Sequence, residues 1–411
     1  MRQSRPAFAP VPIDLAPADL AARLVRPGFA FLDSSLASAE SHSILASDPD
    51  LILSGSAADW PHLAHELDQR RHDSANSGLP EGAAIGWFSF DGSYRFAFYE
   101  NLLAFNHGTE TWQLRGSLPP QTDPPRAHQT PRFQAEITES QFCQMVRRAQ
   151  EFIAAGDIYQ ACLSHRFSAD FLGSPWPFYG SLRHNSPAPH AAYLDLGDRT
   201  VLSASPESFL RLSGNHVVTR PIKGTRPRRA DHDHDERSAY DLLTSDKEVA
   251  ELVMITDLER NDLGRVCEYG SVQVTDLLRL ERFEQVFHLV STIEGQLRPD
   301  VTHLDAVAAC FPGGSISGAP KARALEIIAE LEPIPRGLYT GAIGYFGFNG
   351  ESQFNIAIRT AVIENARASF HVGAGIVADS IPEREWQETL DKAAGILLAA
   401  ERCKTHDEIC T

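Results

Sequence analysis

The chain has 411 residues, of which 43% are hydrophobic and 22% are charged, and its formal net charge is −17. This composition is typical of a globular protein, and a chain of this length buries a large core without disulfide or metal staples. The acidic charge and the absence of a basic patch interleaved with aromatics exclude general attraction to nucleic-acid phosphates. No apolar run is long enough to span a bilayer, and residues 1–14 have no signal-like apolar core. We therefore expect no nucleic-acid partner and no membrane partner.

The sequence pattern divides the chain into four parts. Residues 1–114 predict mixed strands and helices, because short apolar runs alternate with turn signals, as at 29–32, 51–53 and 84–90. Residues 115–133 are proline-rich and almost without periodicity, which predicts a linker or a long surface connection. Residues 134–403 are strongly patterned, and 404–411 form a tail. The six cysteines show no C-x-x-C spacing, which predicts reduced thiols in a cytoplasmic protein.

Helices are predicted in the patterned part at 139–155, 245–257, 321–331 and 382–402. Ser245 with Glu248, and Ser380 with Glu383, have the spacing of capping boxes. Strands are predicted at 339–348, 353–364 and 369–377, with Asn349-Gly350 as a hairpin turn between the first two. The charged stretch 226–237 (RPRRADHDHDER) predicts an exposed loop rather than a metal site.

Two E-x-x-E pairs are the first candidate for chemistry. Glu248 and Glu251 are three residues apart in one predicted helix, and Glu385 and Glu388 are three apart in another, so each pair lies on one helical face. Carboxylates from two helices suit Mg²⁺, which binds oxygen ligands and keeps several waters. Glutamate is also common near helix N-termini, so spacing alone leaves a purely structural role open.

Glycine-rich segments are the second candidate. PGGSISGAPK (residues 312–321) leads into a helix, where free N–H groups can receive an anion, although the segment is not a Walker A loop. VGAGIV (residues 372–377) has glycines that let backbone N–H groups approach an anion closely. A flexible turn in the first segment and tight packing in the second are the structural alternatives.

Two cations complete the candidates. Arg359 lies in the apolar sequence NIAIRTA, where an unpaired charge is costly, so it needs a fixed anion. A bound carboxylate and a structural glutamate satisfy that need equally well. Lys223, in RPIKGTRPR, is surface charge unless it is desolvated, in which case its pKa falls and it becomes a nucleophile.

Together and in this order, these pieces resemble the chorismate-utilising enzymes, a family that includes anthranilate, aminodeoxychorismate, isochorismate and salicylate synthases. The resemblance covers roughly residues 135–400 and is carried by GDIYQACLSHRF, LSASPESF, PIKGTRPR, DKEVAELVMITDLERNDLGRV, FPGGSISGAPKARALEII, GAIGYF, NIAIRTA and GAGIVADSIPEREWQETLDKA. It implies an α+β fold in which two antiparallel sheets pack face to face, with helices outside. It also implies that residues 134–403 form the chorismate-binding catalytic region.

The resemblance implies a role for each matching residue. Glu251 and Glu388 would ligate Mg²⁺, and Glu248 and Glu385 would act through waters. The ion would hold the ring carboxylate of chorismate, with Lys392 nearby. The residues expected to hold the enolpyruvyl arm are Tyr339, Arg359, Gly373 and Gly375, and those expected to line the pocket near the ring are Ser315 and His288.

Two positions indicate the reaction within the family. Gln160 stands where isochorismate and salicylate synthases resemble one another in having a water-activating lysine, which favours ammonia as the nucleophile here. Anthranilate synthases typically have alanine in PIAGT, whereas PIKGT is similar to the aminodeoxychorismate synthases. There the lysine, here Lys223, is thought to attack C2 of chorismate before ammonia enters at C4. Glu207 resembles the family's acid/base carboxylate, and we expect burial beside the magnesium and the substrate-binding cations to favour the neutral form of the lysine.

The resemblance therefore implies conversion of chorismate and ammonia to 4-amino-4-deoxychorismate for p-aminobenzoate and folate synthesis. Because no cysteine lies in a G-x-C-x-G turn and the sequence stops at Thr411, we expect a separate glutamine amidotransferase subunit to supply the ammonia. The first alternative is anthranilate synthase component I. A more remote one is a non-catalytic, amino-acid-binding regulatory subunit, based on FLDSS (residues 31–35).

Overall fold

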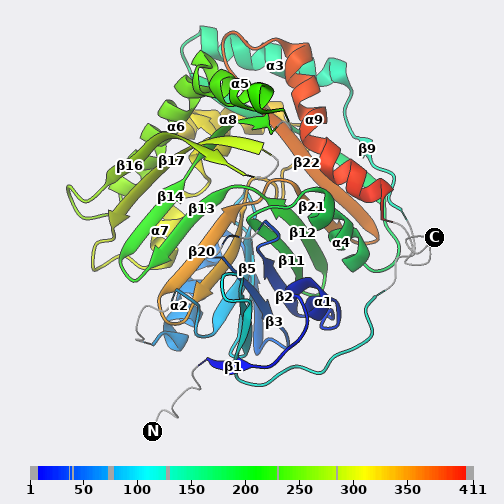
Figure 1. Cartoon of the computed structure of the whole chain (residues 1–411). Coiled ribbons are helices and arrows are strands. Elements are labelled where there is room, and N and C mark those ends of the chain that lie inside the picture. Colours follow the sequence, from blue (N-terminus) through cyan, green and yellow to red (C-terminus); the bar gives the residue numbers. More distant parts are fainter. Residues whose placement is uncertain are drawn as a thin grey trace.

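The computed structural model describes residues 8–403 except 37, 39–40, 73–77, 126–129, 229–230 and 284–285. The predicted tail at 404–411, with Cys410, lies outside the described residues. Two antiparallel sheets of twelve and ten strands form the centre of the molecule (Figure 1). This confirms the predicted α+β fold. In the described part of the chain, no helix is long and apolar enough to cross a membrane.

The twelve-stranded sheet contains, in order across it, β1 (Ala9–Val11), β8 (Thr111–Arg115), β7 (Leu102–Asn106), β3 (His42–Ala46), β2 (Phe29–Asp33), β11 (His190–Asp195), β12 (Arg199–Ser205), β21 (Thr360–Glu364), β22 (Arg367–Ile376), β10 (Gln160–Asp170) and β18 (Gly318–Ala319), with β9 (Gln134–Ala135) beside β10. The ten-stranded sheet contains β15 (Ile222–Pro227), β17 (Val286–Gln296), β14 (His216–Arg220), β13 (Ser208–Ser213), β20 (Glu351–Ile356), β19 (Ala342–Gly347), β5 (Ala83–Phe88), β6 (Tyr94–Tyr99) and β4 (Leu51–Gly55), with β16 (Gln273–Arg282) beside β17. The helices are α1 (Pro17–Ala22), α2 (Trp60–Arg70), α3 (Glu139–Ala154), α4 (Trp176–Asn185), α5 (His232–Leu243), α6 (Asp246–Gly264), α7 (His303–Cys310), α8 (Lys321–Leu331) and α9 (Pro382–Glu401), with short 3-10 helices η1 (Ala57–Asp59) and η2 (Gly314–Ile316).

The alternation of side chains along the strands explains the layers. In β5, Ala83, Ile85 and Trp87 belong to the core between the sheets, whereas Ala84 and Phe88 belong to the core beneath the helices. Both faces of this strand are buried, which is why its sequence reads as a continuous apolar run.

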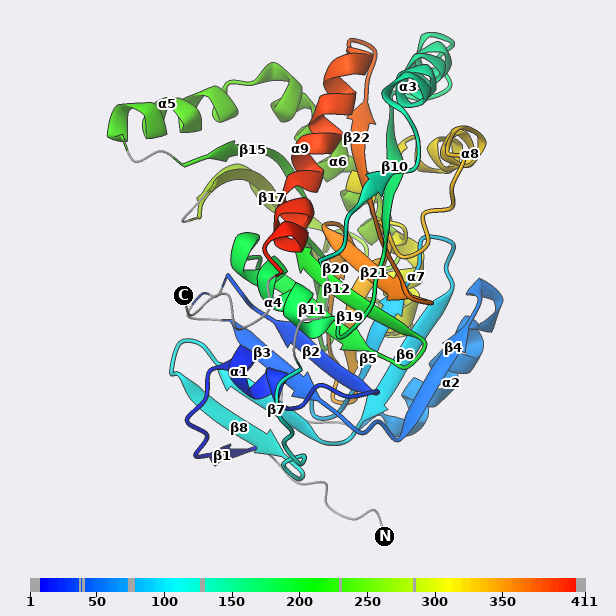
Figure 2. The same ribbon diagram turned by 90° about the vertical axis from the view of Figure 1, so that its right-hand side faces the viewer.

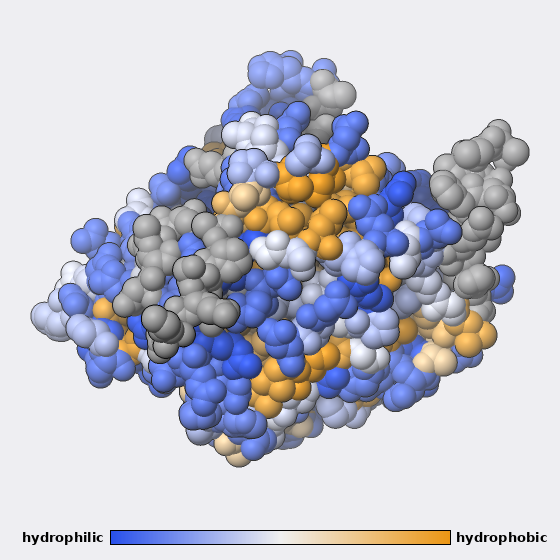
Figure 3. Space-filling view, turned by 90° about the horizontal axis from the view of Figure 1, so that it is seen from below, coloured by the Kyte–Doolittle hydropathy of each residue, from blue (hydrophilic) through white to orange (hydrophobic). Residues whose placement is uncertain are grey.

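Helices cover the outer face of each sheet (Figure 2). Residues of α2, α6 and α7 pack in one core cluster with the ten-stranded sheet, and residues of α1, α4 and α9 pack in another with the twelve-stranded sheet. The face seen from below in Figure 3 carries small apolar patches among hydrophilic residues. Such patches are ordinary, because more than half of a typical protein surface is apolar.

Residues 1–114 do not form a unit of their own. They contribute β4, β5 and β6 to the ten-stranded sheet and β1, β2, β3, β7 and β8 to the twelve-stranded one. The N-terminal part therefore shares its core with residues 134–403. The predicted connection at 115–133 begins with Arg115, which is the last residue of β8, whereas its other described residues, 116–125 and 130–133, contain no helix or strand.

Several local predictions are confirmed. Helix α8 has the predicted bounds, α3 ends one residue early, and Gly156 follows it with φ +84°. Asn349-Gly350 joins β19 to β20, with φ +81° at the glycine. One of the two hydrogen bonds of the predicted capping box is present at the start of α6, where Ser245 accepts from the Glu248 N–H. The helix runs seven residues beyond the predicted end.

Three local predictions are wrong. The strand predicted at 353–364 is two strands, because the chain leaves the ten-stranded sheet after Ile356 and enters the twelve-stranded sheet at Thr360. The loop predicted at 226–237 is helical from His232, where Asp231 caps α5. Ser380 does not cap α9, because its hydroxyl donates to Glu385 instead.

Candidate active site

The predicted site residues come from segments that are distant in sequence but meet near α6, α9, β15 and β22 (Figure 2). Lys223 Nζ on β15 lies 3.5 Å from Glu251 Oε2 on α6. Lys247 Nζ, also on α6, lies 3.7 Å from Glu385 Oε1 on α9. A Cβ on Gly375 of β22 would lie 3.8 Å from Glu251 Oε2, so these four elements share one site.

Lysine side chains lie beside the glutamates of this site. Lys392 Nζ lies 2.8 Å from Glu388 Oε1 and also donates to the Gly373 carbonyl at 2.9 Å. Burial lowers the pKa of Lys247, but the negative charges of all four glutamates outweigh burial, so its pKa is raised. Sequence reasoning missed Lys247, although it lies beside Glu248 in DKEVAEL.

The carboxylates differ in their electrostatics. Burial raises the pKa of Glu248, and the neighbouring Glu251 raises it further. Burial also raises the pKa of Glu385, partly offset by the Ser380 hydroxyl. Burial alone would raise the pKa of Glu388, but Lys392 outweighs it and the pKa lies below its ordinary value.

The residues present fit a magnesium ion chemically, although no three His, Cys, Asp or Glu side chains in the described residues converge closely enough to hold one. The donors are carboxylates on two helices, and Mg²⁺ needs only one or two of them directly because it keeps its waters. Glu385 Oε2 is buried without a hydrogen-bond partner among the described residues, which is costly unless something else binds it.

Lys223 and Glu207 are both buried at this site. Burial raises the pKa of Glu207, offset in part by the Ser315 hydroxyl and by Lys223. Burial lowers the pKa of Lys223, but Glu251 and Glu207 outweigh it, so the pKa is raised. In the chain alone, carboxylates are the immediate neighbours of Lys223. The expectation that burial beside magnesium and the substrate-binding cations favours its neutral form stays a prediction.

Arg359 lies at the turn between β20 and β21 rather than in a strand, with φ +48°. Burial lowers its pKa, and in the described part of the chain no acidic side chain lies within ion-pair distance of it. A structural glutamate therefore does not pair with Arg359 there, which favours a bound anion. Burial and Arg359 lower the pKa of nearby His288 to about 4, so this imidazole is neutral near pH 7.

The glycines on β22 permit close approach of their neighbours. A Cβ on Gly373 would lie 2.9 Å from the Tyr339 hydroxyl, and one on Gly375 would lie 2.4 Å from Gln160 Nε2. Any larger residue would displace these side chains. Ser315 is joined to the same site through its carbonyl, 3.5 Å from Lys223 Nζ. The structure thus brings together the predicted residues of β15, β22, α6, α9 and η2, and it places His288 near Arg359.

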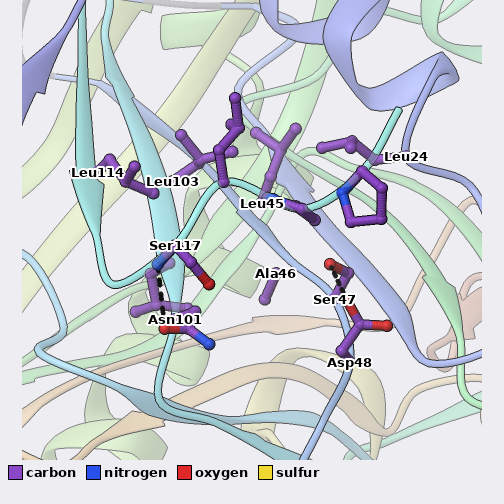
Figure 4. A pocket seen from close by; sticks show the side chains of 13 residues that line it. Leu24, Leu45, Ala46, Ser47, Asp48, Asn101, Leu103, Leu114 and Ser117 are labelled. Carbon is purple, nitrogen blue, oxygen red and sulfur yellow. Dashed lines mark hydrogen bonds between the residues drawn. The ribbon is translucent and has the colours of Figure 1, made fainter. Parts of the chain in front are cut away.

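A cavity of about 100 Å³ in the N-terminal half is separate from this site (Figure 4). Leu24, Leu45, Leu103 and Leu114 line one side of it, and Asp48 lies on the other. It contains none of the predicted catalytic residues. Near FLDSS, the buried Asp33 accepts hydrogen bonds from Tyr179 and Arg183, at 3.1 and 2.9 Å.

Glu259 is a buried carboxyl behind the site that sequence reasoning did not select. Thr219 Oγ1 lies 2.7 Å from both the Phe209 carbonyl and Glu259 Oε2. One hydroxyl proton cannot serve both acceptors, so a protonated Glu259 that donates to the hydroxyl satisfies both contacts. Burial raises the pKa of Glu259 to about 8, in agreement with this arrangement.

We expect Glu259→Gln to stabilise the protein increasingly as pH rises from 5 to 8. The folded pKa is above the ordinary 4.5, so the stability that this proton contributes is present below pH 4.5 and is lost as pH rises toward 8. Glutamine keeps a hydrogen bond without titrating. The gain in unfolding free energy should grow by up to about 1.4 kcal/mol per pH unit.

Urea unfolding of both proteins at pH 5, 6, 7 and 8 measures this change. Asp257→Asn, on an exposed position of the same helix, is the control and should show no such trend. An equal effect of Glu259→Gln at pH 5 and pH 8 would contradict a buried, protonated Glu259.

Comparison with known proteins shows the family. The family described as chorismate binding enzyme matches residues 29–398. Anthranilate synthase component 1 of Thermus thermophilus is 48% identical over 289 residues, which are 70% of this chain and 62% of that protein. Aminodeoxychorismate synthase component 1 of Bacillus subtilis is 44% identical over 277 residues, 67% of this chain and 59% of that protein.

The chain thus spans about 60% of the length of these curated relatives. The crystal structure of anthranilate synthase component I from Streptococcus pneumoniae superposes with a TM-score of 0.78 at 33% identity, covering 88% of this chain and 93% of that one.

Proposed function

The chain belongs to the family of chorismate binding enzymes, and we propose that it aminates chorismate in a magnesium-dependent reaction, with 4-amino-4-deoxychorismate as the product. The observation that carries this proposal is the placement of Lys223. Its ammonium lies beside Glu251 and the Ser315 carbonyl, and its charge is coupled to that of the buried Glu207. A lysine with a carboxyl group beside it is the pair that covalent amination requires.

Substrate binding is assigned to the cations and glycines of the site. Glu251 and Glu388 would hold Mg²⁺, with Glu248 and Glu385 acting through its waters. When bound, the ion supplies positive charge that offsets the ring carboxylate of the substrate. Arg359 would bind the carboxylate of the enolpyruvyl arm, because a forked guanidinium suits a carboxylate and no acidic side chain in the described residues occupies it.

The N–H groups of Gly373 and Gly375 and the Tyr339 hydroxyl would bind the same arm. Ser315 and His288 would contact the ring, and Lys392 would add positive charge near the ring carboxylate.

The reaction would proceed in two displacements. The neutral amine of Lys223 attacks C2 of chorismate, both conjugated ring double bonds shift by one position, and the C4 hydroxyl leaves as water. Glu207 supplies the proton for that hydroxyl and removes one from the lysine nitrogen. Ammonia then attacks C4, both double bonds shift back and the bond between C2 and the lysine nitrogen breaks. The proton lost by the new C4 ammonium group restores Lys223 as a neutral amine. Two displacements retain the configuration at C4.

Anthranilate synthesis is the second candidate, and the relatives favour it more than they favour the first. The T. thermophilus relative and the S. pneumoniae structure are both anthranilate synthases. That reaction releases pyruvate, whereas formation of 4-amino-4-deoxychorismate retains the enolpyruvyl arm, so the products distinguish the two.

We expect the purified protein to convert chorismate, in the presence of Mg²⁺ and ammonium, to a product that keeps the enolpyruvyl group. Mass spectrometry identifies the product, and a lactate dehydrogenase assay measures pyruvate. Potassium chloride in place of ammonium chloride is the control. Anthranilate with one equivalent of pyruvate would establish the second candidate, and unreacted chorismate would refute both.

Glutamine provides a further arm of the same experiment. Glutamine alone should not support turnover, because no cysteine in the chain lies in a G-x-C-x-G turn. Glutamine with a separate amidotransferase subunit should support it. Turnover with glutamine and the pure chain would contradict the proposed partner.

A further inference from the structure

A buried ion pair lies between α8 and β19, outside the residues assigned to the reaction. Arg336 Nε and Nη2 donate to the two oxygens of Glu332, at 2.9 and 2.7 Å. The two side chains are only 1% and 5% exposed. Burying two charges is expensive, and well-packed apolar residues at such positions are often at least as stabilising. The pair therefore calls for an explanation other than stability.

Arg336 uses its remaining donors on two backbone carbonyls and one side-chain hydroxyl, in three different segments. Nη1 donates to the Ile316 carbonyl and to Thr340 Oγ1, each at 3.1 Å. Nη2 also donates to the Cys162 carbonyl at 2.5 Å. The guanidinium thus joins η2, the turn before β19 and strand β10. A guanidinium is suited to this task, because its donors point in fixed directions.

Glu332 strengthens the connection to β10. Its Oε1 accepts hydrogen bonds from the Ser164 N–H at 2.7 Å and from the Ser164 hydroxyl at 2.9 Å. On the other side of β10, Ser164 pairs with Gly373 and Cys162 pairs with Gly375. The ion pair therefore fixes the strand against which the glycines of β22 lie.

Two of the three joined segments carry a residue assigned to substrate, and the third, β10, pairs with the strand that carries Gly373 and Gly375. Ile316 follows Ser315 in η2, and Thr340 follows Tyr339, whose carbonyl accepts a hydrogen bond from Thr340 Oγ1 at 2.5 Å. The Arg336 guanidinium also lies 5.8 Å from the centre of the Tyr339 ring. Movement of Arg336 would displace these parts of the site together.

We propose that Arg336 and Glu332 are a positioning pair, which fixes the distances among Ser315, Tyr339 and the glycines of β22. This inference rests on the proposed use of the site for chorismate. Neither residue touches the substrate. Misplacement by about 1 Å is enough to lower turnover roughly 100-fold.

Arg336→Lys tests the proposal, because lysine keeps the charge but has only one nitrogen. We expect kcat to fall roughly 100-fold while KM changes little, since the binding groups remain but are misplaced. Hydrogen–deuterium exchange should rise in residues 160–164, 314–317 and 338–341, and less elsewhere. Arg115→Lys is the matched control, because Arg115 is also 1% exposed and bonds a carbonyl, that of Glu100, at 2.6 Å.

Arg115 lies in β8, near the opposite edge of the twelve-stranded sheet from β10. Its variant should lose stability without a comparable loss of kcat. Equal losses of kcat in the two variants, or wild-type kcat and exchange in Arg336→Lys, would overturn the proposal.

A milder pair of variants serves if Arg336→Lys does not fold. Thr340→Val removes the hydroxyl at nearly constant volume and should lower kcat, whereas Thr340→Ser keeps the hydroxyl and should restore it. Unchanged kcat in Thr340→Val would count against the proposal. If the wild type does not use chorismate, the proposed function fails, but the exchange measurement still decides whether the pair holds these three segments.

Discussion

Lys223→Ala is expected to lower formation of 4-amino-4-deoxychorismate by roughly 10³-fold and to abolish any covalent intermediate. Lys223 is buried against Glu251 and close enough to Glu207 for their charges to interact, so its removal deletes the nucleophile from an otherwise formed site. In the wild type without ammonia, a covalent adduct with the mass of enzyme plus chorismate minus water should accumulate. Peptide mass mapping should place it on Lys223.

Lys223→Arg separates nucleophilic catalysis from simple charge. Arginine keeps the positive charge beside Glu251 but is always protonated and cannot attack carbon. It should form no adduct and should be nearly as inactive as the alanine variant. Full activity of Lys223→Arg, together with no adduct in the wild type, would refute the covalent mechanism. Lys223→Ala should still bind chorismate, and a shift of its product to anthranilate would link this position to the choice of reaction.

Glu251→Gln or Glu388→Gln is expected to lower turnover by more than roughly 100-fold, because even partners outside the direct ligands of a metal are worth 10–100-fold. Each substitution removes a charged ligand proposed to bind magnesium. The fold should persist. Glu251 raises the pKa of Glu248 by repulsion, so Glu251→Gln relieves an unfavourable interaction. Calorimetric titration with Mg²⁺ should show weaker binding in both variants.

Glu383→Gln provides the matched control. Glu383 is in the first turn of the same helix as Glu388, but it is 56% exposed and pairs with Arg147. It should keep wild-type turnover and magnesium affinity. Excess EDTA should stop the wild type, and added Mg²⁺ should restore it. Turnover that survives EDTA, or full activity of Glu251→Gln, would remove magnesium from the mechanism.

Much of the fold follows from local pattern. Helix α3 begins at a capping box formed by Thr138 and Gln141 and ends before Gly156, and both signals act within a few residues. The buried strand β5 is apolar on both faces, so its sequence alone indicates a position inside the molecule. The candidate site residues were also selected from sequence, because the resemblance to a family matches motif to motif without coordinates, and their roles stay predictions.

Tertiary structure decided the outcome where a local sequence signal competes with a contact to a distant residue. Ser380 has the spacing for a capping box with Glu383, but its hydroxyl donates to the buried carboxylate of Glu385. Leaving a buried carboxylate without a hydrogen bond costs more free energy than leaving an exposed helix end uncapped, because water can bind the helix end. The segment around Arg359 is mostly apolar, and its pattern predicts one strand. Only the packing of two sheets shows that the chain crosses between them there, with Arg359 at the turn.

Dependence on distant partners also explains why sequence reasoning did not identify Lys247 or the Arg336–Glu332 pair. Arg336 joins Cys162, Ile316 and Thr340, which are up to 174 residues away along the chain. Periodicity reports which face of an element is buried, but it carries no information about which distant carbonyl or carboxylate a buried charge meets. Sequence therefore determined which residues are available for chemistry. Folding determined which of them are buried together in one site and so shift one another's pKa.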